Sequence, residues 1–314
     1  MEADFMSTGG RGTYAPIALF TYARPDHTRA VIEALKRNTL AKASNLIVYS
    51  DAARTAAEEE RVRKVRRYLH TVDGFQSVKI VESPRNLGLA QSITAGISET
   101  IEEWGKIIVL EDDILTSPCF LEFMNCALER FQNQRRVWHV SGWNYPIDSS
   151  GLSEAFLIRV MNCWGWATWR DRWVHFRKRP TRLLASWHAK DIYAFNLDGA
   201  HDFWRQVVRN AEGSLDTWAI FWYATIFENR GLCVNPSSSC TENIGLDGSG
   251  TNSGRKFLKE KITLKETFAG FGEFPLVESD IALQRIRRYY LRRRVRARIR
   301  QSWQRASGLL RGSR

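Results

Sequence analysis

Residues 105–123 read GKIIVLEDDILTSPCFLEF, and in this stretch four apolar residues run directly into Glu111, Asp112 and Asp113. The apolar run is too short for a helix and too apolar for an exposed edge, so it predicts a buried central strand of a parallel sheet. Ligands of open α/β sheets bind at the ends of such strands. Three adjacent carboxylates repel one another, and a hard divalent cation would relieve that repulsion. Taken alone, the triplet is more typical of a solvated acidic loop after a strand, and only its context favours the metal site.

The first half of the chain alternates strand-like and helical patterns. Strand patterns cover residues 15–21, 45–50, 77–81 and 106–110. Between them, Val62, Val65 and Leu69 share one helix face, and an apolar residue recurs every fourth position from Leu89 to Ile101. Strand, helix, strand in this order implies right-handed crossovers. It predicts an α/β fold with a mixed, mainly parallel sheet and helices on both faces.

Ten of the twelve tryptophans lie in the second half, between residues 138 and 222. Most are expected to pack in the core, because spacing such as that of Trp166, Trp169 and Trp173 would place the rings on one helix face. One or two are expected to stack on the apolar face of a sugar ring. The candidates for stacking are Trp143, Trp164 and Trp166.

Charge is distributed unevenly along the 314 residues. The chain has 46 basic and 34 acidic side chains, and residues 281–314 hold twelve arginines, no lysine and no acid. The apolar residues that recur there at roughly helical spacing are Ile286, Tyr290, Val295, Ile299 and Trp303. This pattern predicts a basic amphipathic helix on an anionic membrane surface. A nucleic-acid tail is disfavoured by the interleaved aromatic residues, and a disordered tail is the third possibility.

Several classes are excluded by composition. No segment approaches the roughly 20 apolar residues of a membrane span. Residues 1–14 carry acids where a signal peptide would be basic, so we expect a disordered N-terminus and a cytoplasmic protein, peripheral on the inner face of the membrane. Five cysteines without CxxC spacing indicate buried reduced thiols rather than disulfides or zinc. His139 is expected to be a hydrogen-bonded core histidine.

Several segments, in order, resemble GT-A-type nucleotide-sugar glycosyltransferases, in particular the N-acetylglucosaminyltransferase I family and bacterial family 2-like proteins. FTYARPDHTRAV resembles the first strand and loop, IVYSDA the second strand, and IIVLEDDILTSPCFLEFM the metal-binding strand with its following helix. VWHVSGWN, CWGWATWRDRW, LDTWAIFW and RGLCVNPSSSCTENIGLDGSGTNSG also match in order. The resemblance covers roughly residues 15–255 and excludes the basic tail.

The resemblance implies a GT-A (Rossmann-like) domain over residues 15–280, with a nucleotide-binding half (15–115) and an acceptor half with a lid (116–280). It implies a metal-dependent, inverting enzyme that transfers a hexosyl or N-acetylhexosaminyl group from a nucleotide-sugar donor, UDP-linked, to a glycan or lipid-linked glycan. Mn²⁺ or Mg²⁺ would stabilise the leaving diphosphate. Synthesis of bacterial surface polysaccharide or lipopolysaccharide would fit a membrane-bound tail.

Five residues receive donor-site roles from the resemblance. Asp113 matches the metal ligand, Asp112 would contact the ribose, and Glu111 would orient the donor sugar. Asp51, at the end of the second strand, resembles the aspartate that recognises uracil. Arg24 matches a basic residue near the nucleotide, and its guanidinium suits a diphosphate oxygen. The alternative for Arg24 is an ordinary surface arginine.

The acceptor side has one candidate general base, Asp216 in GSLDTWAIFW. The family pattern has paired acids before the tryptophan, whereas here Leu215 and Thr217 flank Asp216, so Thr217 is an alternative occupant of the base position. The structural alternative is a helix N-cap, with Ser214 or Asp216 opening the helix that starts at Trp218.

The glycine-rich stretch 241–254 resembles a lid that closes over the nucleotide-sugar, although by itself it indicates only a flexible connection. The lid residues predicted to matter are Gly245, Asp247, Gly248 and Gly250. The stretch lacks the lysine of a P-loop. Two other functions stay open: a nucleotidyltransferase, whose basic glycine-rich first loop is missing from ALFTYARPDH, and a non-catalytic adaptor that acts through its tail.

Overall fold

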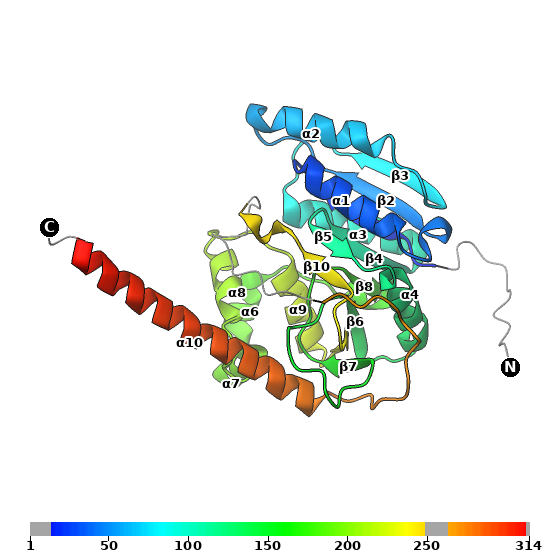
Figure 1. The fold of residues 1–314 in the computed structure, drawn as a ribbon. Coiled ribbons are helices and arrows are strands. Elements are labelled where there is room, and N and C mark those ends of the chain that lie inside the picture. The colour runs from blue at the N-terminus through cyan, green and yellow to red at the C-terminus, as the bar shows by residue number, and fades with distance from the viewer. Residues whose placement is uncertain (1–13, 249–262, 312–314) are drawn as a thin grey trace.

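The computed structural model describes residues 14–248 and 263–311, with the side chains of the last helix described up to residue 296. Of the N-terminal region 1–14, predicted to be disordered, residues 1–13 lie outside these ranges. Gly250 of the predicted lid also lies outside them. Figure 1 shows a central sheet with helices packed against it and one long C-terminal helix.

An eight-stranded sheet runs through both predicted halves of the molecule, in the order β3-β2-β1-β4-β8-β6-β9-β7. Its strands are β1 (Ile17–Thr21), β2 (Asn45–Ser50), β3 (Ser77–Glu82), β4 (Lys106–Glu111), β6 (Val137–Ser141), β7 (Ala155–Ile158), β8 (Trp166–Trp169) and β9 (Leu232–Pro236). A two-stranded ribbon pairs β5 (Ile114–Thr116) with β10 (Thr241–Asn243). Strands β3, β2, β1 and β4 are parallel, whereas β8 and β7 run antiparallel to their neighbours.

The helices cover both faces of this sheet. They are α1 (Pro25–Lys36), α2 (Ala56–Leu69), α3 (Leu89–Trp104), α4 (Phe120–Phe131), α5 (Arg170–Trp173), α6 (Pro180–Ser186), α7 (Ala189–Phe195), α8 (Trp204–Ala211), α9 (Ala219–Glu228) and α10 (Asp280–Arg311). Alternation along β1 separates two cores: Ile17 and Leu19 pack with α1, α2 and α4, whereas Ala18 and Phe20 pack with α3 and α9. The predicted α/β class, with a mixed, mainly parallel sheet, is confirmed.

The tryptophans of β8 correct one prediction. Trp166 and Trp169 lie on a strand that pairs with β4, so they point to opposite faces instead of sharing a helix face. Trp166 packs in the core with α9, whereas the Trp169 indole donates a hydrogen bond to the Leu128 carbonyl oxygen of α4 at 3.0 Å. Trp173, on α5, returns to the Trp166 side. Strand pairing with distant segments overrode the helical spacing.

Helix α10 confirms the predicted C-terminal helix. Its first turns, however, pack against the protein and not against a membrane. Ala282, Leu283 and Ile286 are buried against the body of the protein. The Tyr290 hydroxyl donates a hydrogen bond to the Tyr145 hydroxyl at 3.1 Å. The expectation that Ile286 and Tyr290 face a membrane is therefore wrong, whereas Val295 is 55% exposed. Of the helices in the described ranges, none combines the length and hydropathy that crossing a membrane requires.

Candidate functional site

The acidic triplet ends β4, beside the end of β1. Asp112 is buried, and its carboxylate accepts the backbone N–H of Tyr22 at 3.2 Å and forms an ion pair with Arg24. A second Arg24 nitrogen lies 3.0 Å from Asp113. Parallel pairing of β1 with β4 brings the loop after β1 to the triplet. The structure thus brings Arg24 to Asp112 and Asp113, which lie far from it in the sequence.

The charges of this cluster are not balanced. Burial, reinforced by Asp113 and Asp112, raises the pKa of Glu111 to about 8. Burial also raises the pKa of Asp112, although Arg24 acts in the opposite direction. For Arg24, burial disfavours the charge, but the two aspartates outweigh it and raise the pKa. One guanidinium among three carboxylates leaves room for further positive charge.

The predicted lid begins as a fixed element. Thr241–Asn243 forms β10 on β5, so this part is a strand and not a free loop, which corrects the prediction. The Ile244 N–H donates to the Asp113 carbonyl oxygen at 2.8 Å. A Cβ on Gly245 would collide with the Asp113 carboxylate and lie 2.9 Å from an Arg24 nitrogen. Glycine at 245 therefore lets the backbone approach the acidic cluster.

Two other predicted lid residues lie just beyond this point. Gly248 has a φ of +94°, a left-handed conformation that favours glycine. One Asp247 carboxylate oxygen lies 3.2 Å from Nε2 of His27 on α1, so protonation of the histidine would make this an ion pair. The described part of the glycine-rich stretch is thus held at both β5 and α1.

Asp51, predicted to recognise the base, ends β2 as expected. Its buried carboxylate already accepts the N–H groups of Leu87 at 2.9 Å and Gly88 at 3.0 Å, and the Asn86 side-chain amide at 3.2 Å. These bonds fix the turn that starts α3. Base recognition by Asp51 stays a prediction, and the structure gives the residue a positioning task that the sequence did not indicate.

The three predicted stacking tryptophans differ in exposure. Trp166 is fully buried, and its ring packs between His139 and Trp218 at centroid distances of 5.1 and 5.3 Å. The stacking prediction is wrong for Trp166, and Trp143, at 5% exposed, also offers no free face. Trp164 is half-buried and packs edge-on against Trp143 at 4.7 Å. Trp164 alone of the three keeps an accessible surface.

The base candidate lies on the loop before α9. Asp216 is exposed and forms an ion pair with Lys178. Thr217 is committed to Asn210, which donates to its hydroxyl at 3.1 Å and accepts its N–H at 3.0 Å. Trp218 precedes α9 without a side-chain cap, so the N-cap alternative for Asp216 is wrong. Through the stacking of Trp218 on Trp166, this loop packs against β8, the neighbour of β4.

The acidic cluster is the candidate site for a divalent metal. Within residues 14–248 and 263–311, no three His, Cys, Asp or Glu side chains converge as a ready metal cage. Asp113 has the more exposed carboxylate of the Arg24 pair, 15% against 4% for Asp112. Hard carboxylate oxygens suit Mn²⁺ or Mg²⁺, which commonly take their other ligands from phosphates and water. The residues fit a metal held partly by Asp113 and partly by phosphate oxygens or water.

Two neighbours of the cluster gave no signal in the sequence. The Tyr22 backbone N–H binds Asp112, and a backbone donor has no residue signature. Burial raises the pKa of the Cys163 thiol, and the charges of Glu111 and Asp113 add to it, so this thiol lies near the triplet. All five cysteines are free, as predicted, but Cys126 is exposed and Cys163 is half-buried, so only Cys119, Cys233 and Cys240 are buried thiols.

Comparison with known proteins gives little beyond this geometry. Neither the protein-family models nor the curated proteins contain a match. Among solved structures, the chain is similar to mannosyltransferase PcManGT from Pyrobaculum calidifontis in complex with GDP-Man and Mn²⁺. Identity is 13% and the TM-score 0.38, over 69% of this chain and 70% of that chain. For S. aureus TarS 1–349, identity is 8% and the TM-score 0.40, over 72% of this chain and 59% of that chain. Likeness of this size carries no conclusion about function.

Proposed function

We propose that this protein is a metal-dependent glycosyltransferase of the GT-A type that uses a nucleotide-sugar donor. The observation that carries the proposal is the cluster of Glu111, Asp112, Asp113 and Arg24 at the carboxyl ends of two adjacent parallel strands. Nucleotides bind at this edge of open α/β sheets. Hard oxygen ligands beside a guanidinium suit a diphosphate and its cation together.

In this proposal the cluster changes partners when the donor binds. Asp113 would hold Mn²⁺ or Mg²⁺, which would supply Lewis-acid stabilisation of the charge on the leaving diphosphate. Arg24 turns from the two aspartates to a diphosphate oxygen. Asp112 contacts the ribose and Glu111 the donor sugar. Gly245 leaves the space that these groups need, since a side chain there would fill it.

The finer assignments belong to the same proposal. The donor is UDP-linked, with Asp51 at the uracil, and the transferred group is hexosyl or N-acetylhexosaminyl. The acceptor is a hydroxyl of a glycan or lipid-linked glycan. Asp216 deprotonates that hydroxyl and transfer inverts the anomeric centre. The packing of the Asp216 loop against β8 supports this placement, and separation from Lys178 would free the carboxylate.

Cellular placement is a further part of the proposal. The protein works in the cytoplasm, on the inner face of the membrane, in the synthesis of bacterial surface polysaccharide or lipopolysaccharide. Because Ile286 and Tyr290 pack inward, contact with anionic lipid belongs to the residues of α10 beyond Tyr290 other than Arg292 and Arg296, which line a groove against the protein body. Val295 is exposed there, and arginines surround it.

Slow donor hydrolysis provides the direct test. The protein is incubated with Mn²⁺ and a panel of UDP- and GDP-linked sugars, and release of the nucleoside diphosphate is measured. We expect hydrolysis of at least one donor and a loss of at least roughly 100-fold in Asp113→Asn, because the diphosphate charge loses its cation. Asp73→Asn, on an exposed aspartate that pairs with Lys36, is the matched control. Hydrolysis of no donor, or full activity of Asp113→Asn, would refute the proposal.

A further inference from the structure

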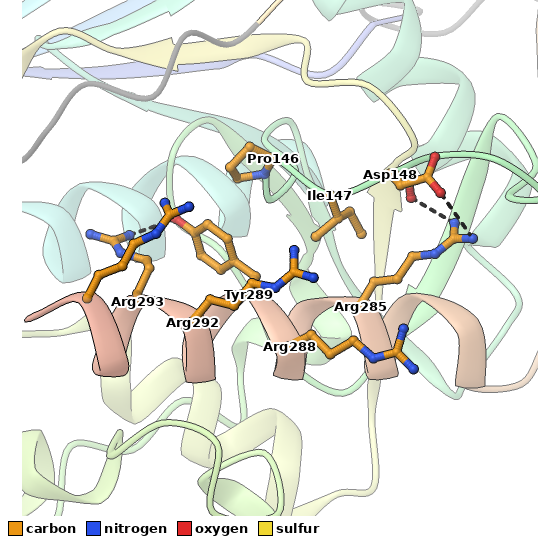
Figure 2. Close-up of a pocket in the computed structure, with 9 residues that line it drawn as sticks. Pro146, Ile147, Asp148, Arg285, Arg288, Tyr289, Arg292 and Arg293 are labelled. Carbon is orange, nitrogen blue, oxygen red and sulfur yellow. Dashed lines mark hydrogen bonds and ion pairs between the residues drawn. The ribbon is translucent and has the colours of Figure 1, made fainter.

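A cationic groove lies between α10 and the loop after β6, away from the acidic triplet. Figure 2 shows the loop facing one side of the helix across this space. The groove has a volume of about 370 Å³. It is lined by Pro146, Ile147, Asp148, Arg285, Arg288, Tyr289, Arg292, Arg293 and Arg296, and we call it the α10 groove.

The arginines of the α10 groove fall into two groups. Arg285 is used internally, since it donates to the carbonyl oxygens of Asp148 and Ser150 at 2.7 Å and lies 3.5 Å from the Asp148 carboxylate. Arg288, Arg292 and Arg296 are exposed and have no ion-pair partner within the described part of the chain. They recur every fourth residue, which places their Cα atoms on one helix face with a rise of about 6 Å from each to the next.

The loop side of the groove carries the apolar side chains of Pro146 and Ile147 and one charge, the Asp148 carboxylate, which lies 3.5 Å from Arg285. Tyr289 adds an aromatic surface from α10 itself. Tyr289 is held in place, because Arg293 donates to its hydroxyl at 2.7 Å and its ring packs on Tyr145 at 5.7 Å. A row of guanidinium groups facing apolar surface suits a ligand that alternates anions with rings or other C–H faces.

Ring contacts connect the α10 groove with the neighbourhood of the triplet. From Tyr289 they pass to Tyr145, then to Trp143 at 4.8 Å and to Trp164 at 4.7 Å. Trp164 follows Cys163, whose thiol lies near Glu111 and Asp113. Trp143 and Tyr145 are buried, so these ring contacts join the groove to the neighbourhood of the triplet through the core.

We propose that the α10 groove binds phosphate groups of an anionic acceptor glycan. Arg288, Arg292 and Arg296 pair with successive phosphates, and Tyr289 packs against a sugar or polyol between them. This inference rests on the proposed glycosyltransferase function and adds the chemical class of the acceptor. A membrane surface fits less well, because the three arginines line a concave groove against the protein body instead of a free face.

The test uses a dextran oligosaccharide that carries phosphate groups and the same dextran without them. Binding is measured by calorimetry on the full chain, with metal chelated so that the triplet does not contribute. We expect the phosphorylated dextran to bind and the neutral one not to. Arg288→Gln/Arg292→Gln/Arg296→Gln should weaken binding roughly tenfold or more and flatten its salt dependence. The matched control removes three exposed arginines from α2, in Arg61→Gln/Arg63→Gln/Arg67→Gln, and should bind as the unmodified protein does.

In the dextran and RNA measurements, the inference is overturned by equal binding of the two dextrans, by equal losses in the two triple variants, or by stronger binding of single-stranded RNA through the same three arginines. Vesicles with anionic lipid form the remaining arm. Vesicle binding that survives in the groove variant supports separate sites, whereas its loss assigns the arginines to the membrane and refutes a glycan groove. Donor hydrolysis is measured in parallel. If hydrolysis persists without dextran binding, the acceptor inference fails and the transferase stands.

Discussion

Arg24 shows at the scale of a single residue how the negative charge of the site is partly compensated before any ligand binds. Its guanidinium is the positive partner of both Asp112 and Asp113, and Asp112 is almost completely buried. Removing one partner of a buried ion pair leaves an uncompensated charge, which costs far more than the pair contributes. Arg24 therefore has a structural task in addition to its proposed contact with diphosphate.

Arg24→Gln should lower the free energy of unfolding by about 2 kcal/mol, a value reduced for the partial exposure of the guanidinium. Added Mn²⁺ should recover part of that loss, since it binds the same carboxylates in the folded state only. Urea unfolding with and without Mn²⁺ measures both effects, and Arg24→Lys, which keeps the charge, should lose less. Unchanged stability of Arg24→Gln would contradict the stabilising role of its ion pairs with Asp112 and Asp113.

Gly245 gives a second residue-scale prediction. In Gly245→Ala the new Cβ would meet the Asp113 carboxylate and Arg24, so we expect donor hydrolysis to fall at least roughly tenfold and stability to drop by about 1–3 kcal/mol. Gly272→Ala is the control, because a Cβ at that position meets nothing within 4 Å. Normal turnover in Gly245→Ala would show that the space is not needed.

At the scale of elements, β6 carries a buried histidine whose bonds define its protonation. The Trp222 indole donates to Nδ1 of His139 at 3.2 Å, so Nε2 carries the hydrogen and faces the Asn162 carbonyl oxygen at 3.0 Å. Burial lowers the pKa of His139 from 6.5 to about 3. The expectation of a hydrogen-bonded core histidine is confirmed.

This lowered pKa predicts how stability responds to acid. Between pH 6.5 and about pH 3 the unfolded chain binds a proton at His139 that the folded protein does not. His139 should therefore cost no stability above pH 6.5, and below it about 1.4 kcal/mol per pH unit. Denaturant unfolding from pH 7.5 to pH 4.5 should show this slope, and His139→Gln should lack that part of it. An identical slope in both proteins would argue against the burial effect.

The elements also show where local sequence was informative. Strands β1, β2 and β4 are continuous apolar runs because both of their faces are buried, and the predicted boundaries lie within two residues of those observed. Strand β8 was missed, because its tryptophans have helical spacing and its strand form depends on pairing with β4 and β6. Strand β10 was also missed, because it too depends on pairing with a distant segment: its partner β5 is more than one hundred residues away.

At the scale of the whole molecule, the first turns of α10 pack into the folded domain, whereas the rest of the helix forms the basic tail. Leu283 and Ile286 are buried, and Tyr290 is bonded to Tyr145. Burying such side chains contributes about 1.5–3 kcal/mol each. Beyond residue 290, the side chains described up to residue 296 are mainly exposed arginines.

Two truncations separate these parts. Removal of residues 281–314 should lower the melting temperature by several degrees, because the core beneath Ile286 becomes exposed. Removal of residues 297–314 should leave the melting temperature within roughly 2 °C. Thermal unfolding of both proteins beside the full chain measures the difference. Equal melting temperatures for the two truncations would mean that the docking of α10 contributes nothing.

The local sequence was sufficient to predict the α/β class, the parallel half of the sheet and the acidic strand end, because hydrophobic patterns and runs of charge are visible in short stretches of sequence. It also located the excess charge in α10. Long-range packing settled the rest. Pairing of β1 with β4 brought Arg24 to the triplet, pairing of β10 with β5 placed Gly245 against Asp113, and docking of α10 turned Ile286 inward. These contacts join residues far apart in sequence, and no short window records which distant segments will meet.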